Sequence, residues 1–306
     1  MPLLRITCPP EHTQRLVALL REQARARDLS VMTGAAPDAG DDVIVVDVPR
    51  QVVDEIIERL PARAAGMEDL HVSISPSIPL YPRDEDTRAD DEAVVWAQVH
   101  HEIAGMGRLS WVNTLLVVIA AAIAAVGIIQ DQLLLLVGAM ALSPDYYPVA
   151  LTCLAVVERD RRALRAGLRT LAVVYTAGAA GALVLSQFLV RLDIVNASNV
   201  PSQQFTLFIS EPNALSVVVA LLAGVAGALG VTLADARGLV GVFVSVTTIP
   251  AAANIGVAIV ARDGPEAAGA AVQLAANVVS LLLAGTATLA LRRWLPERPT
   301  ARDRRA

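Results

Sequence analysis

The residues best suited to chemistry lie in one proline-rich stretch of an otherwise apolar segment. Six consecutive residues carry its polar groups and its prolines: Ser143, Pro144, Asp145, Tyr146, Tyr147 and Pro148. An acid inside a membrane segment is costly unless it faces water, protein or a bound partner, so Asp145 is a candidate ion or solute site. The tyrosine hydroxyls can donate to a bound carboxylate or orient Asp145. The alternative is a re-entrant or surface loop, in which Asp-Tyr-Tyr is an ordinary interfacial cluster.

A second polar group follows about a hundred residues later. It consists of Thr247 and Thr248, the proline Pro250, and Asn254 one turn beyond. A proline inside a helix removes a backbone donor and clashes with the preceding turn. We therefore predict that Pro144 and Pro148 break one membrane helix and that Pro250 breaks another. A site built from both groups would place one acid opposite neutral hydroxyl and amide groups, beside half-helix ends that can hold ions or zwitterions.

The two groups occupy matching places in an internal repeat. With a shift of 103 residues, 115–172 aligns without a gap on 218–275, and the pair Arg159-Asp160 falls on Arg262-Asp263. Gly127 falls on Gly230 in the same register. Interrupted helices at matching positions of two repeats are the best pointer in a sequence to a transport site.

The elements that must position these groups are membrane helices. The chain has 306 residues, of which 55% are hydrophobic, and its apolar runs are long enough to cross a bilayer as helices. Six such runs are present: Trp111–Ile129, Leu133–Val157, Leu168–Val190, Leu215–Ala234, Leu239–Ala261 and Ala267–Leu291. They lack the alternation of a barrel strand, so we expect an α-helical polytopic membrane protein.

The arginines predict the orientation of these spans. They concentrate between spans two and three and after span six, and the positive-inside rule places that side, with both termini, in the cytoplasm. Three spans in each copy then make the repeat inverted. The arginines are explained by topology and the net charge is −5, so we expect no nucleic-acid partner.

Before the first span, the chain reads as a small soluble domain. Strand-like runs at 3–8, 29–33, 43–46 and 70–74 alternate with two helical patterns in the order βαββαβ, which predicts a ferredoxin-like head. We expect the second strand to end at Gly34. The predicted divisions are a cytoplasmic domain (1–76), a Pro-rich acidic linker (77–91), an amphipathic interfacial helix (92–108), repeat 1 (109–192), an outer loop (193–213), repeat 2 (214–291) and a basic tail (292–306).

The body also resembles a known family. Three stretches carry the resemblance: Val137-Gly138-Ala139-Met140 through Pro148, 220–228, and Gly241 through Pro250 to Gly256. They are similar to the prokaryotic "uncharacterised hydrophobic domain" membrane family, DUF389. The resemblance covers about 111–291 and implies a multi-spanning protein of a prokaryotic inner membrane, with no catalytic residues to carry over. The chain departs from the commoner family pattern at 145–147 and at 247–250.

These observations favour a secondary transporter or facilitator of a small polar solute, such as an amino acid or organic acid. Asp145 would bind the coupling proton or cation, and the solute would contact Ser143, Tyr146, Tyr147, Thr247, Thr248 and Asn254. The alternative is a membrane-anchored sensor or scaffold whose head binds a small ligand. Hydrolase, zincin and P-loop motifs are missing from the sequence, so we expect no enzyme, no metal and no cofactor. Small-residue runs such as 178–182 and 224–230 predict close helix packing, within a subunit or between the subunits of a homo-oligomer.

Overall fold

The computed structural model describes residues 2–22, 27–36, 40–60, 70–76, 94–195, 214–232 and 237–294. The chain forms two compact units, one built on residues up to 100 and one on residues 101–295. Each unit is described here by itself. The predicted linker, most of the outer loop and the C-terminal tail lie outside the described residues.

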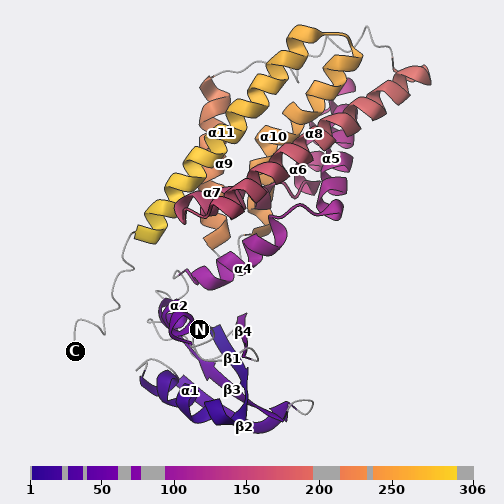
Figure 1. Ribbon diagram of the computed structural model, residues 1–306. Coiled ribbons are helices and arrows are strands. Elements are labelled where there is room, and N and C mark those ends of the chain that lie inside the picture. Colours follow the sequence, from indigo (N-terminus) through magenta and orange to yellow (C-terminus); the bar gives the residue numbers. More distant parts are fainter. Residues whose placement is uncertain are drawn as a thin grey trace. The chain divides into compact units, whose positions relative to one another are not determined.

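The first unit is a four-stranded antiparallel sheet with two helices. Along the chain its elements are β1 (Pro2–Cys8), α1 (Pro10–Glu22), β2 (Arg27–Ala36), β3 (Asp41–Asp47), α2 (Arg50–Arg59) and β4 (His71–Pro76). The strands lie side by side in the order β2-β3-β1-β4 (Figure 1). Alternate residues of β1, Leu4 and Ile6, are fully buried, and the core also takes Leu16 from α1 and Ile56 from α2. The alternation of strand and helix patterns therefore builds one core.

Strand β2 differs from the sequence prediction at its end. It continues past Gly34 to Ala36, with a register shift against β3 between Met32 and Ala36. Gly34 has a φ of +61°, a conformation that glycine adopts without strain and that lets a strand bulge without ending. The N–H of Gly34 donates to Asp42 Oδ1 at 2.9 Å, and Thr13 Oγ1 donates to Asp42 Oδ2 at 2.6 Å. The Thr13 hydroxyl and then the Gly34 N–H lower the pKa of the Asp42 carboxyl below its ordinary value.

Helix α4 (Trp96–Met106) starts later than the predicted interfacial helix, whose first two residues lie outside the described part. The physical reason for this start is an N-terminal cap supplied by Asp54. Both carboxylate oxygens of Asp54 accept from the first backbone N–H groups of α4, those of Trp96 and Ala97, at 2.8 Å each. The first N–H groups of a helix have no partner within the helix, and a carboxylate satisfies them well.

The second unit is a bundle of helices. They are α5 (Trp111–Ile129), α6 (Leu133–Leu142), α7 (Tyr146–Val157), α8 (Arg161–Arg191), α9 (Ala214–Thr232), α10 (Arg237–Val260) and α11 (Gly264–Trp294), all labelled in Figure 1. Large apolar side chains cover its outside: Leu134 is 83% exposed, Leu222 64% and Leu283 63%. Such a surface is unfavourable in water and suits lipid.

The described residues do not confirm the six spans predicted from sequence. By length and composition, α5, α8, α9 and α11 can each cross a membrane, and α6 with α7 makes a fifth if that bent pair is one span. In α10 the apolar stretch among the described side chains is Thr248–Val260, which is shorter than a span. The described residues thus support a membrane protein with four such helices, or five with the bent pair.

Of the three predicted helix breaks, one is present. Helices α6 and α7 are bent by 54° at Ser143–Asp145, which includes Pro144. The prediction for Pro148 is wrong, because Pro148 is the third residue of α7, where backbone N–H groups lack helical partners and a proline is tolerated. The prediction for Pro250 is also wrong, since α10 continues through it. Buried alanines at 251–253 let neighbouring helices pack closely around that point, which holds the helix together despite the missing donor.

Corresponding helices of the two sequence copies bury the same positions. The buried residues of α5 are Val117, Ala120, Ala121, Ala124, Ala125, Gly127 and Ile128. Those of α9 are Ala220, Ala223, Gly224, Gly227, Ala228, Gly230 and Val231, each 103 residues later, together with Thr232. Because burial depends on how the helices pack, the matching buried positions support the repeat independently of sequence identity.

The helix ends match in the same register. Arg159 and Arg262 both have a φ of +59°, and the N–H groups of the following residues, Asp160 and Asp263, return to the carbonyls of Ala155 and Ala258 at 3.0 Å. Both aspartates then accept a backbone N–H in the first turn of the next helix. The Arg-Asp pairs are therefore a shared helix stop and helix start.

Candidate functional site

Asp145 lies at the bend between α6 and α7 and is 1% exposed. Its Oδ1 accepts from Ser143 Oγ at 3.0 Å. Its Oδ2 accepts from Tyr175 Oη at 3.0 Å and from Thr248 Oγ1 at 2.5 Å. Hydroxyl groups from the bend, from α8 and from α10 thus meet at one buried carboxylate.

The local sequence directs Asp145 away from its own helix. Ser143 precedes a proline, which favours extended backbone, and its φ and ψ are −79° and 127°. Asp145 follows as the N-cap of α7, yet its side chain makes no capping hydrogen bond. An N-cap side chain normally accepts from the second or third N–H of the helix. Because the third residue is Pro148, one of those donors is missing, and the carboxylate bonds to α8 and α10 instead.

The surroundings of Asp145 are polar but carry no buried base. Among the described residues of the body, Asp145 is the one Asp, Glu, Arg or His whose side chain counts as buried. Transfer of a carboxylate out of water is strongly unfavourable unless hydrogen bonds replace its hydration. The hydroxyl groups supply that replacement without neutralising the charge. The described residues include no group of three acidic, histidine or cysteine side chains that could hold a metal.

The other residues predicted for the site are spread more widely. Tyr146 is buried, but its hydroxyl donates to the Gly227 carbonyl of α9 at 2.8 Å and so serves helix packing. Tyr147 lies half-buried against the ring of Tyr146, with ring centres 5.3 Å apart. Asn254 donates to Glu266 Oε1 at 3.1 Å. The side chain of Thr247 lies outside the described part of the structure.

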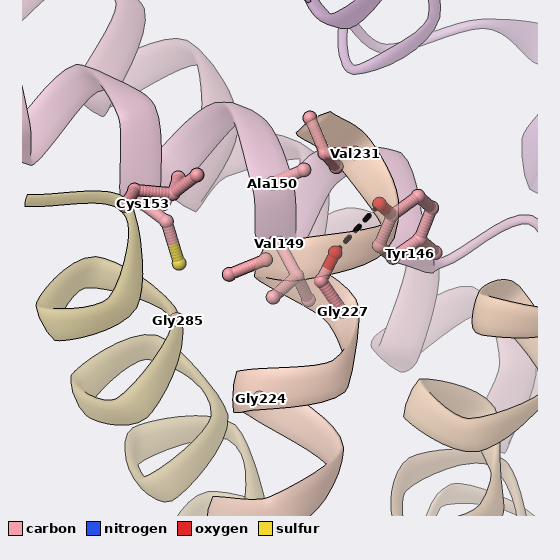
Figure 2. Close-up of a pocket in the computed structure, with 10 residues that line it drawn as sticks. Tyr146, Val149, Ala150, Cys153, Gly224, Gly227, Val231 and Gly285 are labelled. Atoms are coloured by element: carbon pink, nitrogen blue, oxygen red, sulfur yellow. Dashed lines mark hydrogen bonds between the residues drawn. The ribbon is translucent and has the colours of Figure 1, made fainter. Parts of the chain in front are cut away.

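A narrow crevice lies beside Tyr146, between α7, α9 and α11 (Figure 2). Its walls are apolar and small, with Gly224, Gly227 and Gly285 on two sides and Cys153 on the third. Its volume is about 10 Å³. That is room for about one water molecule, so the crevice as it stands holds no amino acid or organic acid.

The sequence analysis missed Tyr175. This residue lies on α8 and is 7% exposed. Its hydroxyl donates a hydrogen bond to Asp145, which lies 30 residues earlier in the sequence. The signal was present, because Tyr175 stands alone among apolar and small residues in the middle of a predicted span. A buried tyrosine hydroxyl needs a partner, and a nearby buried acid is an obvious one.

Asp145 and Thr248 are also equivalent positions of the repeat, 103 residues apart. Other contacts between the copies are reciprocal. A Cβ on Gly285 would lie 2.9 Å from Cys153 Sγ, and a Cβ on Gly256 would lie 3.0 Å from the Cβ of Ala182. Gly285 is the equivalent of Ala182 in the repeat, and Gly256 is the equivalent of Cys153, so the same contact occurs in both directions between the copies. Reciprocal contacts are the mark of two-fold symmetry, and equivalent residues touch only on its axis.

Comparison with known proteins gives a family for this region. Residues 140–283 match the family model described as "Domain of unknown function (DUF389)". The match covers a little under half of the chain. The resemblance predicted from the sequence is confirmed, and the DUF389 match contains Ser143, Asp145, Tyr175 and Thr248. Because the function of this domain is unknown, the match assigns no role to these four residues.

The chain also has a distant curated relative. The uncharacterized protein MJ0678 of Methanocaldococcus jannaschii is 21% identical over 234 residues, which cover 75% of this chain and 70% of the relative. No solved structure matches the chain. The chemistry of the site therefore has to be argued from its own residues.

Proposed function

We propose that this protein is a secondary transporter or facilitator of a small polar solute, coupled to a proton or cation at Asp145. One observation carries the proposal: a buried carboxylate at a helix bend accepts hydrogen bonds from hydroxyl groups of the bend, α8 and α10. Acids in membrane interiors are rare, and proton relays and ion pathways are where they occur.

The repeat supports a transporter architecture. Matching buried faces in α5 and α9, reciprocal contacts and the pairing of Asp145 with Thr248 all favour a two-fold axis through the site. With three spans in each copy, six in all, that axis lies in the membrane plane and the repeat is inverted. Inverted repeats give a transporter two related conformations around a fixed central site.

Orientation and the head complete the proposal. The arginines of the α7–α8 connection and of the end of α11 favour a cytoplasmic side for both termini, in an inner membrane. The order βαββαβ, together with the antiparallel strand order β2-β3-β1-β4, favours a ferredoxin-like head with a regulatory or assembly role.

The hydrogen bonds suggest how binding at Asp145 affects the helices. An ionised carboxylate only accepts, so the hydroxyls of Ser143, Tyr175 and Thr248 can all donate to it. Protonation turns one oxygen into a donor, and a bound cation competes with the hydroxyls for its lone pairs. Either event weakens the link from the bend to α8 and α10, which is the coupling a transporter needs.

The test is charge movement by the full-length protein in proteoliposomes on a solid-supported membrane. Amino acids, organic acids and inorganic cations are applied as concentration jumps at several pH values. We expect a solute-dependent current whose size changes with pH. Asp145→Asn should keep the protein folded and remove the pH dependence, because the amide cannot exchange a proton in this range.

Asp193→Asn is the matched control. It makes the same chemical change at an exposed position just after α8 and should leave the current and its pH dependence unchanged. Transport by Asp145→Asn with an unaltered pH profile would exclude Asp145 as the coupling site. Saturable ligand binding by the protein with no flux of any solute would instead favour the sensor or scaffold function.

A further inference from the structure

Helix α11 carries a line of buried polar side chains that the proposed site does not use. Gln273 and Asn277 are one helical turn apart and are 4% and 2% exposed, and Gln273 Nε2 donates to Asn277 Oδ1 at 3.1 Å. About two turns earlier, Glu266 accepts from Asn254 of α10 at 3.1 Å. These four residues form what we name the α11 polar tract.

One atom of the tract has no partner among the residues that the structure describes. Gln273 Oε1 is buried and accepts no hydrogen bond from any residue that the structure describes. Buried polar atoms are nearly always paired, with protein or with ordered water, because an unpaired one is unfavourable. Among the described residues this acceptor is left open, and water or a cationic group bearing N–H would satisfy it.

The first copy of the repeat shows that packing does not demand these polar groups. The equivalents of Gln273 and Asn277 are Thr170 and Val174, which are buried to the same degree, at 3% and 2% exposed. Thr170 satisfies its own hydroxyl by donating to the Ala166 carbonyl at 2.9 Å. The equivalents of Glu266 and Asn254 are alanine and leucine. The tract is therefore a property of one copy alone.

The repeat also relates the tract to the site. Tyr175 of α8 reaches Asp145, and the α11 position equivalent to it is residue 278, next to Asn277. The α11 polar tract thus extends from the α10–α11 turn, at Glu266, to the depth of the Asp145–Thr248 pair. This step rests on the proposed two-fold repeat.

We propose that the α11 polar tract is a hydrated access route by which small cations reach Asp145 from the α10–α11 side of the membrane. Its polar groups suit cations rather than anions. The route begins at the Glu266 carboxylate, passes an unpaired carbonyl oxygen and ends at the Asp145 carboxylate. None of the described arginines of the body is buried.

The test is cysteine accessibility, which needs no transport. In a full-length Cys8→Ser, Cys153→Ala background, Gln273→Cys and Asn277→Cys are compared with Thr170→Cys and Val174→Cys. Each is treated in liposomes with a cationic (ethyltrimethylammonium) and an anionic (ethylsulfonate) methanethiosulfonate. Burial alone predicts equal labelling of the two pairs. We expect labelling at 273 and 277 and not at 170 and 174. The ratio of the cationic to the anionic labelling rate should exceed the ratio measured for a free thiol in solution by about tenfold, the lower end of the enhancement that charged clefts produce.

A second variant addresses the charge. Glu266→Gln, added to Gln273→Cys, should bring the ratio of the two labelling rates toward that of a free thiol while labelling persists. If Gln273→Cys does not fold, as judged by size-exclusion chromatography, Asn277→Cys carries the comparison. Equal labelling of the tract and of its equivalents, no labelling of either, or a cationic-to-anionic rate ratio no higher than that of a free thiol would overturn the proposal.

The outcomes separate this inference from the proposed function. Labelling confined to the tract in a protein without flux would keep the route and remove the transporter. A pH-dependent current lost in Asp145→Asn, in a protein whose tract is not labelled, would keep the transporter and remove the route.

Discussion

The hydrogen bond between Thr248 and Asp145 offers the sharpest test of the site. It joins α10 to the bend before α7 at 2.5 Å between oxygens, and both residues are essentially inaccessible, at 0% and 1% exposed. A double-mutant cycle with Thr248→Val and Asp145→Ala removes each partner alone and both together. The cavity left by Asp145→Ala is common to both legs that contain it and cancels from the coupling energy.

The size of the coupling reports the charge of Asp145. A hydrogen bond to a charged group contributes about 1.5–3 kcal/mol. Hydrogen bonds between membrane helices measured in the same way average about 0.6 kcal/mol. Since Asp145 accepts from several hydroxyls, we expect an ionised carboxylate and a coupling free energy in the higher range.

The assay is reversible unfolding in mixed micelles of nonionic detergent and SDS, followed by circular dichroism. Thr152→Val is the matched control. Thr152 is 2% exposed, as deeply buried as the site, but its hydroxyl donates to the Pro148 carbonyl within its own helix. Thr152→Val combined with Asp145→Ala should therefore show no coupling. A coupling of Thr248 with Asp145 that is indistinguishable from this control would refute the geometry of the site.

Two further predictions test the packing of the body and the head. Gly256→Ala should destabilise the body by about 1–3 kcal/mol, the cost of overpacking, because its Cβ would lie within 2.5 Å of α8 backbone atoms. Gly138→Ala is the control and should leave thermal stability unchanged, because a Cβ there has nothing within 4 Å. Equal shifts of the melting temperature in the two variants would contradict this prediction. In the head, the pKa of Asp42 is lower in the folded protein than in the unfolded chain. The ionised Asp42 carboxylate therefore stabilises the fold at pH values above its unfolded pKa, and this stabilisation is lost as the pH falls through its folded pKa. Acid unfolding of Thr13→Val followed by circular dichroism should therefore begin at higher pH than that of the unmodified protein, and an unshifted acid transition would contradict the assignment.

The helices were predictable because their signals are local. The span predicted at Trp111–Ile129 has the observed bounds of α5, and the predicted second span has the outer ends of α6 and α7. Apolar runs end where the Arg-Asp pairs provide a left-handed residue and a cap, and both features are visible in the sequence. The bend at Pro144 was also predictable, because the residue before a proline favours extended backbone.

The failures came from context that a sequence does not display. A proline breaks a helix in its interior but not in its first turn, and the first residue of α7 decided the outcome for Pro148. Packing carried α10 through Pro250. The sequence also could not show that Tyr146 faces Gly227 while Tyr175 faces Asp145, because both contacts depend on how helices from distant parts of the chain pack together.

The asymmetry at the centre of the repeat follows from electrostatics. Equivalent residues meet where Asp145 contacts Thr248, so a second acid at 248 would place two carboxylates within hydrogen-bonding distance. Two unit charges 4 Å apart repel by about 4 kcal/mol at an effective dielectric constant of 20, and such a pair retains a shared proton instead of exchanging one. Threonine supplies a donor without a charge and leaves Asp145 able to ionise. The same logic accounts for valine at 278, the equivalent of Tyr175, because the second copy has no carboxylate for a hydroxyl to satisfy. The copies can share their packing faces, but only one of them can carry the acid.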